Sequence, residues 1–279
     1  MKQYIIPGLA VLIAGILSWL AWTGEAVQVE PASVHTPANE DVVLPIHWGD
    51  VGSQLVEKGV IDLDKFKSIY ESRGGLGEEE VLLTGGMELK EIRMTAENSG
   101  ELLNMLWAFG LANKNEILEK GPMRDPRYGG AENFASTGGW SIAKGDAMEH
   151  YSAYELVKLT GEQQKRVERV SQNIYRPCCG NSTYFPDCNH GMAMLGLLEL
   201  MAAENASEEK MYEVALAVNR LWFPSTYETI DAYVKERGLE NKVTPKDLLG
   251  AEYSSGQGYQ NILSQVKNLP KPQGGSCGV

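Results

Sequence analysis

The pattern of residues 191–203 predicts a helix that is apolar around almost its whole circumference. Its large apolar side chains are spread over all faces: Met192, Met194, Leu195, Leu197, Leu198, Leu200 and Met201. Such a helix has no side that prefers water, so other elements must pack around it. The sequence therefore predicts a helical core with residues 191–203 buried inside it.

Helical patterns also dominate the rest of the chain, so the fold class expected is mainly α, a helical globular domain. Asp62, Ser99, Thr160, Ser207 and Thr244 are of the types that cap helix N-termini, and each precedes a helical pattern. The helices expected cover residues 49–59, 63–72, 99–109, 146–159, 161–175, 207–222, 225–238 and 256–269, with a short one opening at 245. Residues 80–95, which contain Gly85 and Gly86, allow a small hairpin.

A long segment rich in glycine and aromatic residues covers residues 121–145. Tyr128, Phe134 and Trp140 lie between its glycines and prolines. Linkers rarely carry so many aromatic side chains, so this segment is expected to be an ordered loop. Such loops often carry function, although the aromatic side chains could equally serve to attach the loop to the helices.

The N-terminus has the composition of a membrane segment. Residues 3–24 contain no charged side chain, Lys2 precedes them and Glu25 follows. About 20 apolar residues span a bilayer as a helix, and a positive charge before them favours a cytoplasmic N-terminus. Residues 1–26 are therefore expected to be a single-pass transmembrane anchor in the cell membrane, with the bulk of the chain on the extracytoplasmic side. A cleaved signal peptide is the alternative.

The remaining organisation follows from composition. Residues 27–45 contain three prolines and are expected to be a tether, followed by a helical and loop region over 46–145, a helical region over 146–270 and a flexible tail over 271–279. The chain has a net charge of -12 and no cluster of Lys and Arg. Such a chain is poorly suited to nucleic acid, so no nucleic-acid partner is expected.

The residues that carry chemistry are concentrated in one loop, over 176–191. Cys178, Cys179 and Cys188, three of the four cysteines in the chain, lie there with His190. Thiolate sulfur and imidazole nitrogen are ligands that soft and borderline metals prefer. The helix that begins at this point also lowers the pKa of nearby thiols, which favours the metal-binding form. The four side chains are therefore predicted to bind a metal ion or an iron–sulfur cluster.

The sequence leaves the identity of the metal open. Three thiolates and one imidazole suit zinc or a two-iron, two-sulfur cluster. Met192 and Met194 follow closely, and thioether ligands would indicate Cu(I), although methionine at these positions also suits core packing. Cys277 in the tail could be a further ligand, a resolving thiol or neither.

Two families have similar sequences in this region. From Cys179 to Cys188 the loop resembles the CDGSH (NEET) iron–sulfur motif, with Cys179, Ser182, Pro186 and Cys188 at matching positions. The family implies a two-iron cluster bound by three cysteines and one histidine. Here the spacings of Cys178 and His190 differ from the family pattern.

The second resemblance covers residues 174–238. A cysteine-rich loop ending in Asp187-Cys188, followed by helices up to the sequence Ile-Asp-Ala-Tyr at 230–233, is similar to PCYCGC-motif proteins of the bacterial envelope. Further cysteines of that family are missing here. This resemblance implies an envelope location and metal binding.

The function expected is metal handling or electron transfer, with a redox or metal-delivery protein as partner. One alternative is an interaction protein stapled by disulfides, for which a Cys179–Cys188 bridge is sterically easy. Another is an enzyme in which Asp146 and His150, one helical turn apart, act as acid and base. That pair could also be a simple surface or capping pair.

Overall fold

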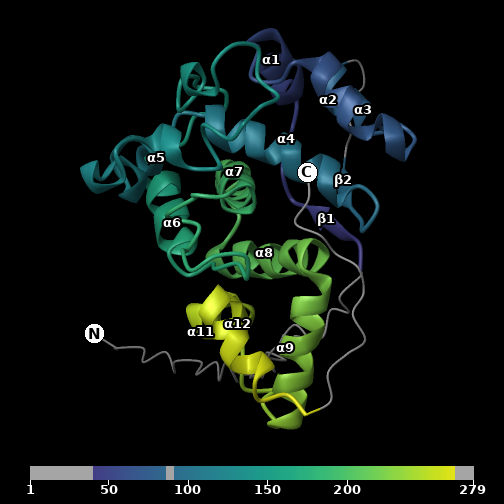
Figure 1. The fold of residues 1–279 in the computed structure, drawn as a ribbon, viewed down its shortest axis with the longest axis vertical. Helices are drawn as coiled ribbons and strands as arrows, with labels where there is room; N and C mark the ends of the chain where they lie inside the picture. The colour runs from purple at the N-terminus through teal and green to yellow at the C-terminus, as the bar shows by residue number, and fades with distance from the viewer. Residues whose placement is uncertain (1–39, 86–90, 268–279) are drawn as a thin grey trace, which may run out of the picture. The chain divides into compact units, whose positions relative to one another are not determined.

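Two buried helices form the centre of the fold, α4 (Ser99–Ala112) and α7 (Asn189–Ala203). The structure is a computed structural model, and it describes residues 40–85 and 91–267. The side chains of α7 from His190 to Ala202 are all buried, as the apolar pattern predicts. The prediction of a mainly α fold is confirmed, and Figure 1 shows other helices on several sides of this pair.

The two central helices approach each other closely at glycines. A Cβ added to Gly110 would lie 2.3 Å from the backbone oxygen of Met192, and one added to Gly196 would lie 2.6 Å from that of Leu106. A larger residue at either position would therefore push the helices apart. The close approach allows the apolar side chains around the crossing to interlock at high packing density.

Further helices cover this pair on several sides. α6 (Gly161–Ser171) and α8 (Glu208–Trp222) pack against α7, and α1 (Val51–Glu57) packs against α4. The neighbouring helices α2 (Leu63–Tyr70) and α3 (Glu80–Thr84) complete this half of the described fold.

Capping residues start most of these helices where the sequence predicts. The side chains of Asp62, Thr160, Ser207 and Thr244 each accept hydrogen bonds from backbone amides of the helix that follows. The free amides of the first turn are thereby satisfied. α4 differs by one position, because Ser99 is its first helical residue and Asn98 occupies the capping position.

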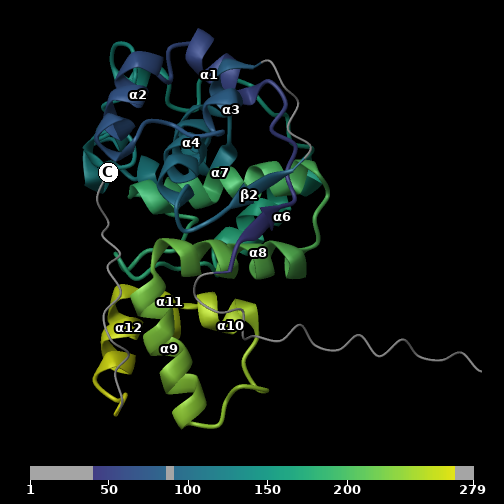
Figure 2. The same cartoon turned by 90° about the vertical axis from the view of Figure 1, so that its right-hand side faces the viewer.

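The C-terminal helices of the described fold form a separate layer beside α8 (Figure 2). They are α9 (Pro224–Glu236), α10 (Pro245–Leu249), α11 (Ala251–Ser254) and α12 (Gly256–Leu263). α10 contacts α8, and α12 contacts α9. α11 was not predicted, and α12 ends earlier than the sequence pattern indicates.

The hairpin prediction for residues 80–95 is wrong. Residues 80–84 are helical, and β2 (Ile92–Met94) pairs antiparallel with β1 (Val42–Leu44). β1 lies within the predicted tether, and its Leu44 side chain is buried in the core. The end of that segment is therefore part of the fold, because removing the apolar Leu44 side chain from water lowers the free energy of the folded state.

The prediction of a helix over 146–159 is also wrong. Only Ala147–Glu149 forms a short 3-10 helix, and the chain then runs beside the end of α4. Backbone hydrogen bonds join Ser152 to Leu111, and Tyr154 to Ala112 and Lys114. Pairing with another segment replaces the hydrogen bonds that a helix would have formed.

The 121–145 segment is an ordered loop, as predicted. It follows the short helix α5 (Glu116–Lys120) and contains 3-10 turns at Pro122–Arg124, Pro126–Tyr128 and Ala131–Asn133. Trp140 is buried, and its indole N–H donates to the backbone oxygen of Val60.

The described residues contain no helix long and apolar enough to cross a membrane. The predicted anchor over 1–26, the first part of the tether and the tail with Cys277 lie outside the described residues.

Candidate metal centre

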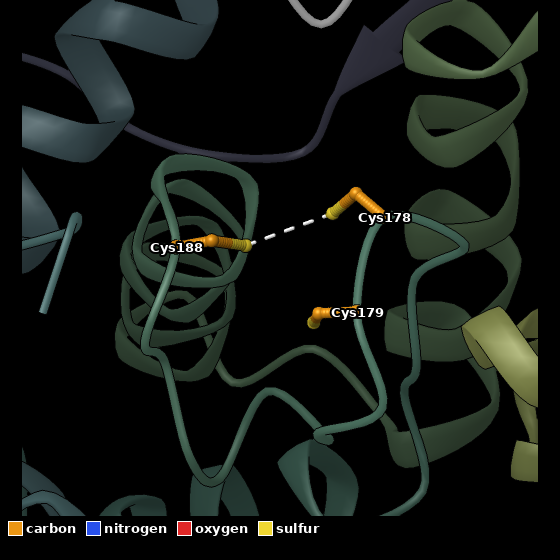
Figure 3. A group of neighbouring side chains, drawn as sticks. All are labelled: Cys178, Cys179 and Cys188. Carbon is orange, nitrogen blue, oxygen red and sulfur yellow. Dashed lines mark hydrogen bonds between the residues drawn. The ribbon is translucent and has the colours of Figure 1, made fainter.

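Three cysteine sulfurs meet between the start of the 176–188 loop and the head of α7. The Sγ atoms of Cys178, Cys179 and Cys188 all lie within 4.8 Å of one another. Figure 3 shows Cys178 and Cys179 on one stretch of the loop, facing Cys188 at the head of α7. The Sγ atoms of Cys178 and Cys188 are 3.7 Å apart. The predicted convergence of the three cysteines is therefore present in the structure.

The loop folds back on itself to bring the sulfurs together. Tyr175 and Ser182 form an isolated antiparallel bridge, and the Thr183 amide donates to the backbone oxygen of Ile174. A turn closes between Ser182 and Phe185. The chain then runs to Cys188, which occupies the capping position of α7.

A buried guanidinium, which the sequence interpretation missed, organises this loop. The Arg176 side chain is 2% exposed, and its Nε donates to the Cys188 sulfur at 2.9 Å. Its terminal nitrogens donate to the backbone oxygens of Asn181 and Phe185, and to the Asp187 carboxylate at 2.6 Å. A buried charge is stable only with such hydrogen-bond partners. The Arg176 side chain thereby joins the turn at Asn181, the turn at Phe185 and the segment from Asp187 to Cys188.

Gly191 provides the space for this guanidinium. A Cβ at position 191 would lie 2.5 Å from the central carbon of the Arg176 guanidinium. Glycine in the first turn of α7 thus lets Arg176 lie against the helix. The signal in the sequence was an arginine two residues before the first cysteine and a glycine three residues after the last.

The three thiols differ in their electrostatic environments. Hydrogen bonds from Cys178 and Cys179 hold the pKa of the Cys188 thiol well below its usual range, and Arg176 adds to this effect. Hydrogen bonding to the other two sulfurs and burial raise the pKa of Cys178, and the pKa of Cys179 is also raised. Cys188 is therefore the most acidic of the three thiols.

The predicted fourth ligand does not belong to this group. Among the described residues, the sulfur cluster contains no histidine. The His190 ring packs against Trp222 and Phe223, with centroid distances of 5.4 and 4.5 Å, and its Nδ1 is 2.9 Å from the Asn189 Oδ1. Burial lowers the pKa of His190 to about 4, so the ring is neutral at pH 7.

The physical reason is the position of His190 in the helix. Cys188 caps α7, and residues two positions apart on a helix face different directions. The Cys188 side chain faces the loop, whereas His190 faces the end of α8. The methionines considered as thioether ligands, Met192 and Met194, are buried in the core. This supports the alternative interpretation of their role, core packing.

Asp146 and His150 each have a structural role. The Asp146 carboxylate accepts a hydrogen bond from the Met148 amide. The buried His150 ring lies 2.9 Å from the Tyr154 hydroxyl and 3.2 Å from the backbone oxygen of Lys144. These contacts fit the capping interpretation better than an acid–base pair.

The 121–145 loop packs against the cysteine loop through aromatic rings. Tyr128, Phe134 and Phe185 form a triangle with centroid distances of 5.2 to 5.4 Å. The amide of Ser136 also donates to the backbone oxygen of Asp187. The aromatic residues of this segment therefore support the loop that carries the sulfurs.

The cysteine loop is also joined to the C-terminal helices. The amide of Gly256, the first residue of α12, donates to the backbone oxygen of Cys179 at 2.7 Å. The amide of Tyr175 donates to the backbone oxygen of Leu249, at the end of α10. The loop is therefore anchored on both sides of its cysteine pair.

The arrangement fits a soft metal ion. With metal–sulfur bonds of about 2.3 Å, the sulfurs of a tetrahedral site are roughly 3.8 Å apart. The separation of 3.7 Å between Cys178 and Cys188 is close to this value. Cys178 is exposed, so an ion could be exchanged with solvent or with another protein. The three cysteines could therefore hold a metal ion.

Comparisons with protein-family models, curated proteins and solved structures give no match to this chain.

Proposed function

We propose that this protein binds a soft metal ion through Cys178, Cys179 and Cys188 and serves in metal handling or electron transfer. The observation that carries the proposal is the convergence of three sulfurs within 4.8 Å, organised by the buried Arg176. Soft thiolate ligands favour Cu(I), zinc and iron–sulfur clusters. The site would bind the ion, and the rest of the fold would hold the loop in shape.

The number of sulfurs favours an exchangeable ion. A structural zinc site and a two-iron cluster each take four protein ligands, whereas three leave a position for an outside ligand. Cu(I), or zinc with an external fourth ligand, suits three sulfurs directly. A cluster would require a fourth side chain, such as Cys277, from outside the described residues.

The setting of this activity follows from the N-terminal sequence. Residues 1–26 would anchor the chain in the cell membrane, with the metal site on the extracytoplasmic side. The exposed Cys178 would then be accessible to a redox or metal-delivery protein. The apolar run and its flanking charges support this part of the proposal.

The test is metal loading of the full chain, purified without oxygen, with Cu(I) and Zn(II) supplied separately. We expect one tightly bound ion per chain, measured by elemental analysis and by a sulfur-to-metal absorption band for copper. Each single replacement of Cys178, Cys179 or Cys188 by serine should weaken metal binding by at least about tenfold, because it removes one ligand.

His190→Gln is the matched variant at the same helix end. It should retain the stoichiometry of the wild-type chain, because the ring contacts Trp222, Phe223 and Asn189. A wild-type chain that binds neither ion while its thiols are reduced would refute the proposal. Unchanged metal affinity in all three serine variants, measured by competition with a chelator, would refute the assigned ligands.

A further inference from the structure

Two of the three sulfurs are placed for chemistry with each other. The Sγ atoms of Cys178 and Cys188 lie 3.7 Å apart, on opposite sides of the site. A disulfide bond requires about 2.05 Å between sulfurs, so a shift of the exposed Cys178 side chain toward Cys188 would close the distance. A bridge between the adjacent Cys178 and Cys179 would be strained.

Metal binding and a disulfide compete for these sulfurs. A thiolate is the metal ligand, and a sulfur in a disulfide has lost that charge. A Cys178–Cys188 bridge would remove two of the three ligands and leave Cys179 alone. We propose that this pair is a redox switch for the metal site: oxidation to a Cys178–Cys188 disulfide releases the ion, and reduction restores the site. This inference rests on the proposed function.

The oxidant is an external disulfide, either a small molecule or the active site of an exchange protein. In the loaded site the exposed Cys178 sulfur is a thiolate because it is a metal ligand. It attacks one sulfur of the external disulfide, whose S–S bond breaks, and the first external thiolate leaves. The Cys188 thiolate then attacks the Cys178 sulfur, and the second external thiolate leaves. Two electrons pass from the cysteines to the external disulfide, any protons on the cysteines pass to the departing thiolates, and the ion leaves with its oxidation state unchanged.

The surroundings select this pair. Arg176 Nε holds the Cys188 sulfur at 2.9 Å, beside the exposed Cys178. The Cys179 sulfur contacts the backbone oxygen of Asn181 and the Asp187 carboxylate, each at 3.9 Å, so it lies toward the inside of the loop. The product is therefore Cys178–Cys188 with Cys179 as a free thiol. From the sequence alone, Cys179–Cys188 is the sterically easy bridge, so the structure favours a different pair.

The experiment uses the full chain loaded anaerobically with Zn(II), treated with oxidised glutathione and monitored with a chromophoric zinc chelator. We expect release of the bound zinc, loss of two of the four thiols and a Cys178–Cys188 crosslink in peptide mass spectrometry. Added dithiothreitol should restore zinc binding. The Cys277→Ser variant should behave in the same way, because the switch does not use that cysteine.

Two further variants test the pair without metal. Apo Cys179→Ser should still form the Cys178–Cys188 bridge, whereas apo Cys188→Ser should stop at a glutathione adduct on Cys178. A chain that binds neither Zn(II) nor Cu(I) would refute the proposed function, whatever the oxidant does. A chain that binds Cu(I) alone takes the same test with release of copper as the readout. Zinc that stays bound in the presence of oxidised glutathione, or zinc released with a bridge between other cysteines, would refute the switch while metal binding stands.

Discussion

At the scale of single residues, the hydrogen bonds of Arg176 fix the conformation of the cysteine loop. The lack of a side chain at Gly191 leaves the space that the Arg176 guanidinium occupies. The guanidinium has sulfur, carbonyl and carboxylate partners, all within the cysteine loop. Removing one partner of a buried charge pair costs about 3–5 kcal/mol, so the loop depends strongly on this group. Its position depends in turn on the missing side chain at residue 191.

Gly191→Ala is therefore expected to weaken metal binding by about tenfold and to lower the free energy of unfolding by ~1–3 kcal/mol. The added methyl group would overlap the Arg176 guanidinium. Metal titration and denaturant unfolding measure the two effects. Gly180→Ala in the same loop is the control, because a Cβ there meets no atom within 4 Å. Equal effects from the two substitutions would contradict this role of Gly191.

The sequence predicted the convergence of the three cysteines but not the groups that support their loop. The three cysteines could be recognised because thiolates clustered in one loop have few other uses. Arg176 could not, since its role depends on a fold-back that brings Asp187 and Cys188 beside it. His190 was predicted beside the cysteines, but its ring packs against Trp222 and Phe223, because proximity in sequence does not show which way a helical residue faces.

At the scale of elements, the crossing of α4 and α7 determines the core. Gly110 and Gly196 lie where each backbone meets the other helix. Close approach increases the number of favourable contacts between the apolar side chains that flank the crossing. The two helices can keep this distance only while both positions lack a side chain.

Gly110→Ala should destabilise the protein by about 2–3 kcal/mol, because its Cβ would meet the backbone oxygen of Met192 at 2.3 Å. Backbone atoms cannot rotate away as a side chain can. Gly100→Ala in the same helix is the matched control, since its Cβ meets nothing within 4 Å. That change should cause no loss and add up to ~1 kcal/mol through helix propensity. Thermal unfolding of both variants would show opposite signs.

Elements with local signals were predicted well, and those that depend on distant partners were not. Thr160, Ser207 and Thr244 mark helix starts through contacts within four residues. The β1–β2 pairing joins segments far apart in the chain, and no local pattern specifies it. Likewise, the segment 146–159 has a helical sequence pattern, but residues in it form backbone hydrogen bonds with the end of α4.

At the scale of the whole described fold, one acidic side chain lies in the apolar centre. Glu199 of α7 is completely buried, and the amide of Asn113 donates to its Oε2. Its Oε1 has no hydrogen-bond partner among the described residues. Burial raises the pKa of Glu199 to about 8, with the Asn113 amide opposing the rise. The carboxyl group is therefore mostly protonated in the folded protein at pH 7.

This group should make stability depend on pH. Between its unfolded pKa of 4.5 and its folded pKa of about 8, unfolding releases a proton from Glu199. The free energy of unfolding should therefore fall by about 1.4 kcal/mol per pH unit as pH rises through this window. Below it the carboxyl group is protonated in both states and contributes no slope.

Glu199→Gln removes the titration and keeps the shape of the side chain. We expect denaturant unfolding from pH 5 to pH 8 to show a shallower fall in stability for the variant than for the wild type. The slope is the informative quantity, because the amide changes the hydrogen bonding at every pH. Parallel curves for the two proteins would mean that Glu199 is ionised in the folded state.

The hydrogen bond from Gly256 to the backbone oxygen of Cys179 connects the ligand loop to a helix that carries no ligand. An ion that restrains Cys179 would also keep that bond closed more of the time. Solvent deuterium should then replace the Gly256 amide proton more slowly in the loaded protein than in the empty one. The first turn of α12 would thus report occupancy of a centre to which it contributes no side chain.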